Sequence, residues 1–586
     1  MRFESLEDPA ARSYYVDTAT SSVTMRAMVS SAAQYPHLAG LRPDLYRCFM
    51  EQTWRHVSTV GTIGLIHSET HFTDEKAGLL REATYRRLRR HWQFVNELKL
   101  FDIDNHVTYG VHVYGGLQDR PVFAMATSLY HPDTVGRSLK HEGSGQEPGL
   151  KDVDGHWDMR PHRRRITLVN DTTLATWHAL LEDSDVPVRR TRMVYAVNAS
   201  VAAALDRLSR APQRIGDLGL RFSQGWNETT DFRRGYFVER WGQPDSWDDV
   251  ILQGPHLFVA TPMYKSPNKA MRSNKDWATT DFEALSESAI PITAYEPVGD
   301  RYQYDSAYTD WGDDDNPNPA RDHYRVAWRS MAAPRNERTL ISALIPPGAA
   351  QLSQSVYAAG SLDGSIESIV LASAFMSSLL SDFFVRSSPK SSVPMSIINQ
   401  IPYVSNSPLM SELRLRILRL SCLTDAYAAL WESGFESGFA DCSWTSLPLG
   451  TSDSRSISVD QRRWSIDTPL RRNAYRRQAL VELDALVALM LGVSADELCS
   501  LYRSQFAVLY GYDRRLSYYD CNGRLVPRSV FRIWRKMGDS LTLEDRTAAN
   551  PAGNVYTYEL PFVTLDREAD MRQAYAEFER RLADQA

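Results

Sequence analysis

The sequence predicts an α/β protein with several domains. Between residues 41 and 130, short apolar strands alternate with helical stretches, which is typical of a sheet covered by helices. Residues 215–350 hold many short β-type runs separated by turn residues, and these indicate a β-rich module. The chain has 586 residues, which is too long for one ordinary core. Helical patterns return at 366–384, 409–431, 475–491 and 495–505.

The strands expected in the first region are short. A helix ends near His56, and residues 62–66 form an apolar strand bounded by Gly61. Two further strands are expected at 95–103 and 109–114.

An arginine-rich helix is expected between these strands. Thr73 is a plausible N-cap, because Asp74 and Glu75 would then lie in the first turn, where carboxylates favour the helix dipole. The apolar side of this helix would carry Leu80, Leu88 and Trp92, leaving Arg86, Arg87 and Arg90 more exposed.

The next region connects this unit to the β-rich module. Residues 131–160 are rich in Gly, Asp, His and Pro, which indicates a loop or domain joint. A strand and a helix start are expected over 166–181, and the apolar run 193–197 is expected to be a strand followed by a helix.

Composition limits where the protein acts. The segment 1–11 is polar and lacks the apolar core of a signal peptide. The longest apolar runs, such as 369–375, are much shorter than the roughly 20 residues of a membrane span, so no membrane partner is expected. Five cysteines occur without CxxC spacing, which favours a cytoplasmic location and argues against a disulfide framework or zinc ribbon.

The net charge of −6 gives no global indication of nucleic-acid binding, but basic residues are locally dense. Residues 81–90 contain five arginines, and 162–165 with 189–192 form a second basic neighbourhood. A protein with an acidic total can bind DNA when its basic residues share one face. Solvated helix faces explain each cluster equally well.

Three long blocks carry a family resemblance. The first includes "GTIGLIHSETHFTDEKAGLLREATYRRLRRHWQFVNELKLFDIDNHVTYGVHVYG", the second contains "QGPHLFVATPMYKSPN" and "LASAFMSSLLSDFFVR", and the third contains "RRQALVELDALVALMLGVSADELCSLYRSQFAVL". The first resembles the region after the catalytic motif of large bacterial DNA adenine-N6 methyltransferases of type IIG restriction–modification and phage-exclusion systems. The second resembles the target-recognition region of that family, and the third its helical C-terminal region.

The resemblance implies a division of the chain. Residues 1–130 would hold the last part of a class I methyltransferase α/β sheet, and 131–214 a connecting α/β region. Residues 215–405 would form the β-rich target-recognition module, and 406–586 a mainly helical C-terminal region.

Family members transfer a methyl group from S-adenosylmethionine to adenine, using a Gly-rich cofactor loop and an Asn/Asp-Pro-Pro-aromatic motif that holds a flipped base. This chain's Pro346-Pro347 follows Ile345 and precedes Gly348, so it lacks both the acceptor and the aromatic residue. The segment 61–64 (GTIG) precedes a strand where a nucleotide loop should follow one. No catalytic or cofactor-binding residue is therefore assigned.

The resemblance implies a DNA-binding, target-specifying portion of a methyltransferase in a defence system. Double-stranded DNA would be one partner, and a second polypeptide would carry the cofactor pocket and catalytic motif. The alternatives are a stand-alone DNA-binding defence component and a truncated remnant, neither with methyl transfer.

Candidate DNA contacts are cationic and amide side chains, which can reach phosphates and base edges. Most of the candidates lie in the segment 264–277. An ordinary basic surface loop explains this segment nearly as well as DNA contact does. Large aromatic residues such as Trp226, Trp241 and Trp328 are expected in the core. The candidates are Lys265, Asn268, Lys269, Arg272, Asn274, Lys275, Arg325 and Arg338.

The segment "HSETH" places His67 and His71 four residues apart, with Glu69 between them. The metalloprotease order is HExxH, and this segment lies between a strand and a helix cap, so no metal site is predicted. In the methyltransferase interpretation, His67 and Phe72 are candidates for the substrate side of the pocket. Motifs for a GxSxG hydrolase, a Walker loop or a nuclease are not found.

Overall fold

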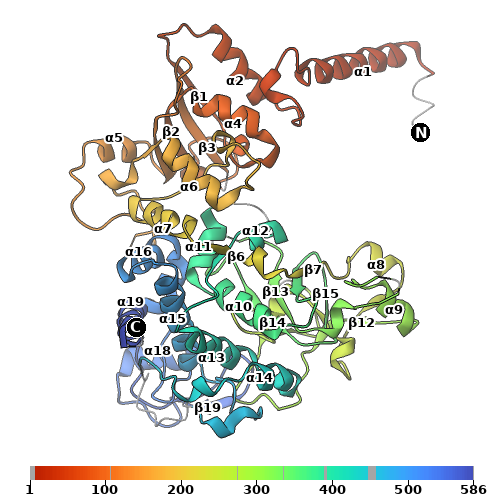
Figure 1. Cartoon of the computed structure of the whole chain (residues 1–586), viewed down its shortest axis with the longest axis vertical. Coiled ribbons are helices and arrows are strands. Elements are labelled where there is room, and N and C mark those ends of the chain that lie inside the picture. The colour runs from red at the N-terminus through yellow and green to blue at the C-terminus, as the bar shows by residue number, and fades with distance from the viewer. Residues whose placement is uncertain are drawn as a thin grey trace. The chain divides into compact units, whose positions relative to one another are not determined.

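The computed structural model describes residues 7–584 except 106, 153, 274, 314, 334–335, 388–391 and 447–456. The chain divides into two compact units, Met1–Ala202 and Ala203–Ala586, joined in sequence by α7 (Ala199–Ser209) (Figure 1). The four-part division expected from the sequence stays a prediction.

The first unit is built on a mixed five-stranded sheet. Its strands lie in the order β1-β3-β2-β4-β5. β3 is antiparallel to both β1 and β2, β2 is parallel to β4, and β4 is antiparallel to β5. The strands are β1 (Ile63–Ser68), β2 (Leu88–Val95), β3 (Thr108–Tyr114), β4 (Phe123–Leu129) and β5 (Thr167–Val169).

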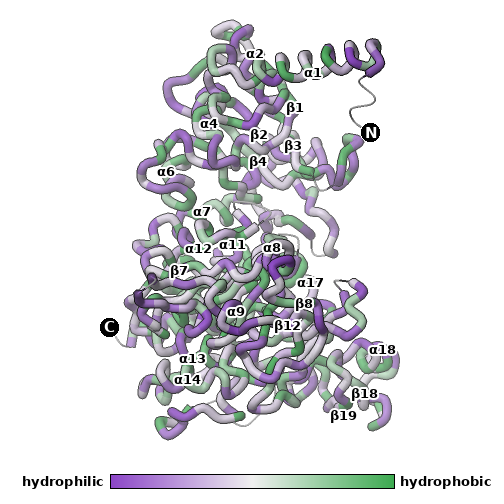
Figure 2. The backbone as a smooth tube through the Cα atoms, turned by 90° about the vertical axis from the view of Figure 1, so that its right-hand side faces the viewer, coloured by the Kyte–Doolittle hydropathy of each residue, from purple (hydrophilic) through white to green (hydrophobic). Residues whose placement is uncertain are grey.

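Helices and short turns surround this sheet (Figure 1). Along most of its length α1 is exposed, and it mixes hydrophilic with hydrophobic residues (Figure 2). α2 ends at His56, as predicted, and α6 follows β5, also as predicted. The helices are α1 (Pro9–Val29), α2 (Leu45–His56), α3 (Thr70–Thr73), α4 (Gly78–Tyr85), α5 (Asp133–Leu139) and α6 (Asp171–Leu181).

The predicted arginine-rich helix is wrong at both ends. Thr73 ends α3, and Asp74 instead caps a 3-10 turn by accepting a hydrogen bond from the backbone N–H of Lys76. The following helix, α4, stops at Tyr85, and β2 begins at Leu88. The reason is a change of period: His91 and Trp92 are both buried although they are adjacent, which fits opposite faces of a strand.

Two expected strands are absent from the described residues. The first, 95–103, is replaced by a loop that Asn96 closes, donating from Nδ2 to the carbonyls of Phe101 and Ile103, both at 3.0 Å. The second, 193–197, is buried but pairs with no strand. Its backbone makes isolated hydrogen bonds instead, such as the one that Met193 N donates to the carbonyl of Phe72. The apolar run 193–197 thus predicted burial but not strand pairing, whereas most of 95–103 is exposed, with Phe101 at 42%.

The second unit begins with the predicted short strands. A four-stranded antiparallel sheet has the order β14-β13-β16-β7, and its central strand β13 (Arg325–Arg329) is almost wholly buried. The other strands of this sheet are β7 (Arg221–Ser223), β14 (Ser342–Ile345) and β16 (Val356–Gly360). Two-stranded ladders join β8 (Phe237–Gly242) to β12 (Thr293–Pro297), β9 (Ile251–Leu252) to β15 (Ala350–Gln351), β10 (Lys265–Pro267) to β11 (Trp277–Thr279), β6 (Gln213–Arg214) to β17 (Pro402–Tyr403), and β18 (Thr547–Ala549) to β19 (Val555–Thr557).

Helices dominate the rest of the second unit, as the sequence predicted. The described helices are α8 (Thr230–Arg233), α9 (Arg301–Ala307), α10 (Ile366–Met376), α11 (Leu379–Ser387), α12 (Met395–Asn399), α13 (Met410–Ser421), α14 (Ala428–Gly434), α15 (Asn473–Met490), α16 (Ala495–Gln505), α17 (Ala507–Arg515), α18 (Arg528–Met537) and α19 (Arg567–Asp584). Within the described ranges, no single helix is long and apolar enough to cross a membrane; α10 and α11, bent by 70°, reach that length and hydropathy only as a pair, and both are mostly buried.

A buried ion network ties α11 to the strand region. Asp382 is fully buried and accepts hydrogen bonds from Arg338 Nε at 2.6 Å and from Arg386 Nε at 2.8 Å. Its carboxylate also accepts from the backbone N–H of Thr339 at 3.0 Å. One carboxylate therefore compensates two guanidinium groups that are themselves almost fully withdrawn from water.

We expect Asp382→Asn to lower the stability of the second unit by about 3–5 kcal/mol, because it leaves two buried cations without their anion. Urea unfolding followed by circular dichroism measures the change. The matched control is Asp206→Asn, which removes an exposed partner of Arg210 and should cost less than about 1 kcal/mol. Equal effects of the two substitutions would contradict the assignment.

Candidate functional site

Three histidines lie on one face of the first unit's sheet. His91 on β2 is directly opposite His112 on β3, and Leu65 on β1 is the other neighbour of His112. Side chains alternate along a strand, so His67 on β1 shares the face of Leu65. Both His91 and His112 are fully buried.

Glu69 brings a buried carboxylate to these histidines. It lies at the start of α3, but its side chain does not cap the helix. Oε2 lies 3.3 Å from His91 Nε2, and Oε1 lies 3.1 Å from His112 Nε2. Tyr195 donates its hydroxyl to Oε2 at 3.1 Å. We call Glu69, His91 and His112 the histidine–glutamate cluster.

His67 lies beside the cluster with both ring nitrogens engaged. Its ring stacks on His112 with centroids 3.8 Å apart, and Nδ1 is 2.9 Å from the carbonyl of Ser68. Because a carbonyl only accepts, Nδ1 carries the proton, and Nε2 accepts from the Tyr114 hydroxyl at 2.8 Å. His67 is therefore held in one tautomer by its own strand and by β3.

Two sequence-predicted residues lie inside this packing. Phe72 is fully buried, and its ring contacts those of His71, Tyr85 and His91. His67 is 9% exposed. Neither side chain presents an open face to a substrate in this structure, in contrast to the pocket-side position expected for both.

Burial sets the protonation of the histidines around the carboxylate. Burial, with His112 adding to it, lowers the pKa of His67 to about 3. Burial also lowers the pKa of His112 and, further, that of His71. For Glu69, burial opposes ionisation, but the neighbouring His91 and His112 outweigh it and hold the pKa well below its usual range. The site thus combines a carboxylate that favours its charged form with the imidazoles of His67, His71 and His112, which favour their neutral form.

Gly110 makes room for this arrangement. It pairs with His67 across the β1–β3 ladder, on the face of the sheet that carries the cluster. A Cβ atom at Gly110 would overlap Glu69 Oε1 and the ring of His112. Only a residue without a side chain allows the carboxylate to approach the sheet so closely.

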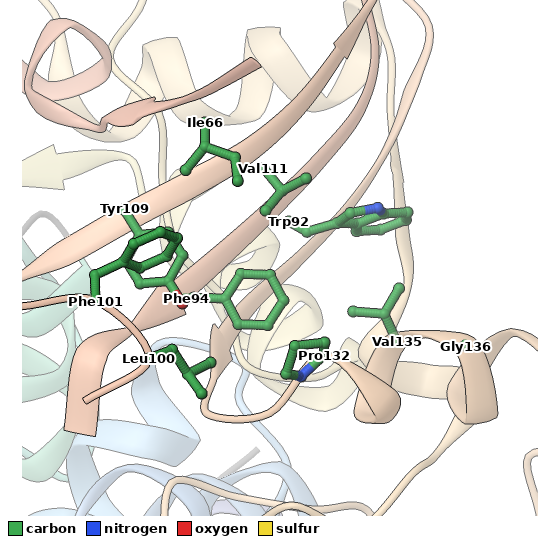
Figure 3. Close-up of a pocket in the computed structure, with 10 residues that line it drawn as sticks. All are labelled: Ile66, Trp92, Phe94, Leu100, Phe101, Tyr109, Val111, Pro132, Val135 and Gly136. Carbon is green, nitrogen blue, oxygen red and sulfur yellow. The ribbon is translucent and has the colours of Figure 1, made fainter. Parts of the chain in front are cut away.

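The opposite face of the same sheet carries an apolar pocket of about 410 Å³ (Figure 3). The described residues that line it include no charged side chain, so the pocket offers no ionic partner to the carboxylate and ammonium groups of S-adenosylmethionine. The lining residues are Ile66, Trp92, Phe94, Leu100, Phe101, Tyr109, Val111, Pro132, Val135 and Gly136.

The second unit presents a basic hairpin, formed by β10, β11 and the connecting residues 268–276. Trp241 anchors it, donating from Nε1 to the carbonyl of Pro267 at 2.7 Å. Lys265 is half-buried, with its Nζ 5.3 Å from the ring centroid of Tyr264. Of the residues expected to contact DNA, Asn268, Lys269, Arg272 and Lys275 are exposed on the hairpin, and Asn274 lies outside the described residues.

Two predicted DNA contacts have structural roles instead. Arg325 is fully buried and donates to the carbonyl of Ala349 and to Gln351 Oε1. Arg338 is 5% exposed and binds Asp382. Neither guanidinium faces solvent, so these two residues offer no contact to DNA in this structure.

The arginine-rich stretch 81–90 is also largely structural. Arg81 is buried and donates from Nε to the carbonyl of Arg190 at 2.9 Å. Arg86 and Arg89 donate to the carbonyls of Gln118 and Gly116. Arg87 donates to the carbonyl of Ala83, which leaves Arg90 as the exposed member of the set.

Sequence reasoning missed His91 and His112. Along the chain they stand 21 residues apart, and they meet only because β2 and β3 pair in one register. The available signal was that a histidine alternates with apolar residues in both "RHWQF" and "YGVHVYG".

Comparisons with known proteins found no match to a family model and none to a curated protein. Among solved structures, the type IIG restriction endonuclease BpuSI is similar, with a TM-score of 0.25 and 11% identity over 78% of this chain and 50% of that one. The type IIL restriction–modification enzyme MmeI, solved in complex with DNA, has a TM-score of 0.32 and 8% identity over 79% and 52%. This chain spans about half the length of each. At such TM-scores, neither likeness extends to function.

We expect Gly110→Ala to destabilise the first unit by about 1–3 kcal/mol, because the new methyl group would displace Glu69 or His112. Thermal unfolding measures the shift. Gly136→Ala in α5 is the control: its Cβ meets no atom within 4 Å, so it should be neutral or stabilise by about 0.5–1 kcal/mol. A tolerated Gly110→Ala would disprove the close approach of Glu69.

Proposed function

We propose that this chain binds double-stranded DNA through the basic hairpin and specifies the target of an S-adenosylmethionine-dependent adenine-N6 methyltransferase. The setting would be a restriction–modification or phage-defence system. The observation that carries the proposal is the hairpin itself, on which four of the residues expected to contact DNA are exposed together.

The shape of the hairpin suits a DNA groove. A two-stranded β-ribbon fits the major groove, where amide and guanidinium groups read base edges and lysines contact phosphates. Asn268 N donates to Asp276 O at 2.8 Å, which closes the loop beyond the two strands. Lys269, Arg272 and Lys275 then project from one short segment.

The charge of the hairpin is available for phosphates. Among the described residues, none of these three cations forms an ion pair, whereas exposed arginines elsewhere in the unit, such as Arg234, are paired with carboxylates. Lys269 does contact a ring, with its Nζ 6.0 Å from the ring centroid of Trp241. A cation without a carboxylate partner gives up no ion pair on binding DNA, and each phosphate contact releases a counterion.

The methyltransferase part of the proposal rests on the sequence resemblance. Because the chain lacks the Asn/Asp-Pro-Pro-aromatic motif and the Gly-rich cofactor loop, a partner polypeptide would supply both. A stand-alone DNA-binding component is the second candidate, and the hairpin favours it equally.

We expect Lys269→Ala, Arg272→Ala and Lys275→Ala together to weaken binding of duplex DNA about 10- to 100-fold at moderate salt. The slope of log K against log salt should become shallower by about 0.9 for each phosphate that the variant no longer neutralises. Fluorescence anisotropy of a labelled duplex, over a series of salt concentrations, measures both quantities.

The control variant combines Arg210→Ala, Arg234→Ala and Arg580→Ala. It removes the same charge from the same unit, but each of these exposed arginines already pairs with a carboxylate. Its affinity should fall much less. Equal reductions of affinity in the two triple variants would show that only net charge matters and would refute the hairpin as the binding element.

We expect the chain alone to transfer no methyl group to DNA, and methylation to appear when the polypeptide encoded immediately upstream is added. Incorporation of tritiated methyl groups into duplex adenine measures this. If the mixture remains inactive while hairpin-dependent binding persists, the stand-alone component is the correct function. Methylation by the chain alone would contradict the need for a partner.

A further inference from the structure

The histidine–glutamate cluster contains several nitrogen and oxygen atoms that make no hydrogen bond and lie close to one another. Glu69, His91 and His112 each offer one ligand atom, and these atoms all lie within 4.8 Å of one another. Although each Nε2 is close to the carboxylate, none of the four ring nitrogens of His91 and His112 makes a hydrogen bond of acceptable geometry. Glu69 Oε1 is also without a hydrogen-bond partner.

So many unmet polar atoms in a dry interior are costly. A buried nitrogen or oxygen without a partner is destabilising, and a buried carboxylate is more so unless a cation compensates it. Among the described residues, the ion-pair partners of Glu69 are His91 and His112. No arginine or lysine of the described chain forms an ion pair with its carboxylate.

We infer that Glu69, His91 and His112 bind a divalent transition-metal ion, for which zinc is the probe. The inference is independent of DNA binding by the second unit. Two imidazole nitrogens and one carboxylate are a ligand set used by zinc and by other first-row metals, whereas magnesium and calcium prefer oxygen ligands throughout.

The distances fit such an ion. Zinc binds nitrogen and carboxylate oxygen at about 2.0–2.2 Å, so two ligands in a tetrahedral site lie roughly 3.3–3.4 Å apart. The observed separations between Glu69 oxygens and the two Nε2 atoms are 3.3 and 3.1 Å. The two separations involve different oxygens of the carboxylate, and one ligand atom from each of the three residues lies within 4.8 Å of the others.

The surroundings also fit a metal centre. Tyr195 donates to Glu69 Oε2, the kind of second contact that orients a ligating carboxylate. His67 stacks on His112 but has both of its own nitrogens bonded, so it supports a ligand without competing to be one. Gly110 leaves the space into which Oε1 and Nε2 converge. The ion would join α3, β2 and β3.

The first test is metal content. Full-length protein is stripped with a chelator, exposed to zinc, freed of unbound metal and analysed by elemental mass spectrometry. We expect about one zinc per chain in the wild type and at least a tenfold loss in His91→Asn and His112→Asn. The control is His162→Asn: this buried histidine of the same unit caps a 3-10 turn, and asparagine can keep that hydrogen bond.

The second test needs no variant and so does not depend on whether a substituted protein folds. Cobalt(II) titrated into the stripped wild type should give visible absorption bands that saturate at about one equivalent and disappear on adding zinc. Zinc should also raise the unfolding temperature of the wild type.

Either of two results overturns the inference. In one, the wild type holds no zinc and cobalt(II) keeps the spectrum of the free ion. The cluster would then be held together by interactions between the carboxylate and the two imidazoles alone. In the other, wild type and His91→Asn bind equal zinc, which would place the metal elsewhere, for example on the partly exposed Asp152 and the exposed Asp154 and His156.

Discussion

The first unit depends on one constraint: the carboxylate of Glu69 is buried and must be satisfied without water. This single requirement explains several choices that otherwise look unrelated. His91 and His112 occupy facing positions on β2 and β3, Tyr195 turns its hydroxyl inward, and Gly110 lacks a side chain. Removing one of these polar side chains, or adding a side chain at Gly110, leaves the buried carboxylate without full compensation. The remaining groups cannot rearrange to restore it within a close-packed interior.

The two faces of this sheet carry side chains of opposite character, one polar and one apolar. One face carries the histidine–glutamate cluster, and the other carries aromatic and aliphatic side chains around the apolar pocket. Alternation along β2 makes this possible, since His91 and Trp92 are neighbours in the chain and point to opposite faces. A shift of register by one residue would place the histidines in the apolar pocket and the tryptophan against Glu69. The polar cluster therefore also fixes strand pairing.

Helices of the second unit were predictable because their signals are local. Ser494 and Glu497 form a capping box, and α16 spans 495–505 as expected from the sequence. The stretch from Leu88 to Trp92 was wrongly expected to be helical, because arginines are compatible with both the helical and the strand period. Its pairing with β3 and β4 decides that it forms a strand. The cluster was unpredictable for a related reason. His91 and His112 lie close together because of the register of β2 and β3, and no local sequence pattern specifies that register.

The arginines show why local charge predicts DNA contact poorly. A guanidinium has five donors and a long apolar stem, so a fold can use it to satisfy several buried acceptors at once. Arg416 does this by bridging Glu412 and Glu482 in the core, and Arg325 does it among backbone and side-chain acceptors. Lysine has a compact, strongly hydrated charge and is harder to bury. Exposed lysines in a turn, such as Lys269 and Lys275, are therefore the better sequence signal for a phosphate contact than arginines within strands.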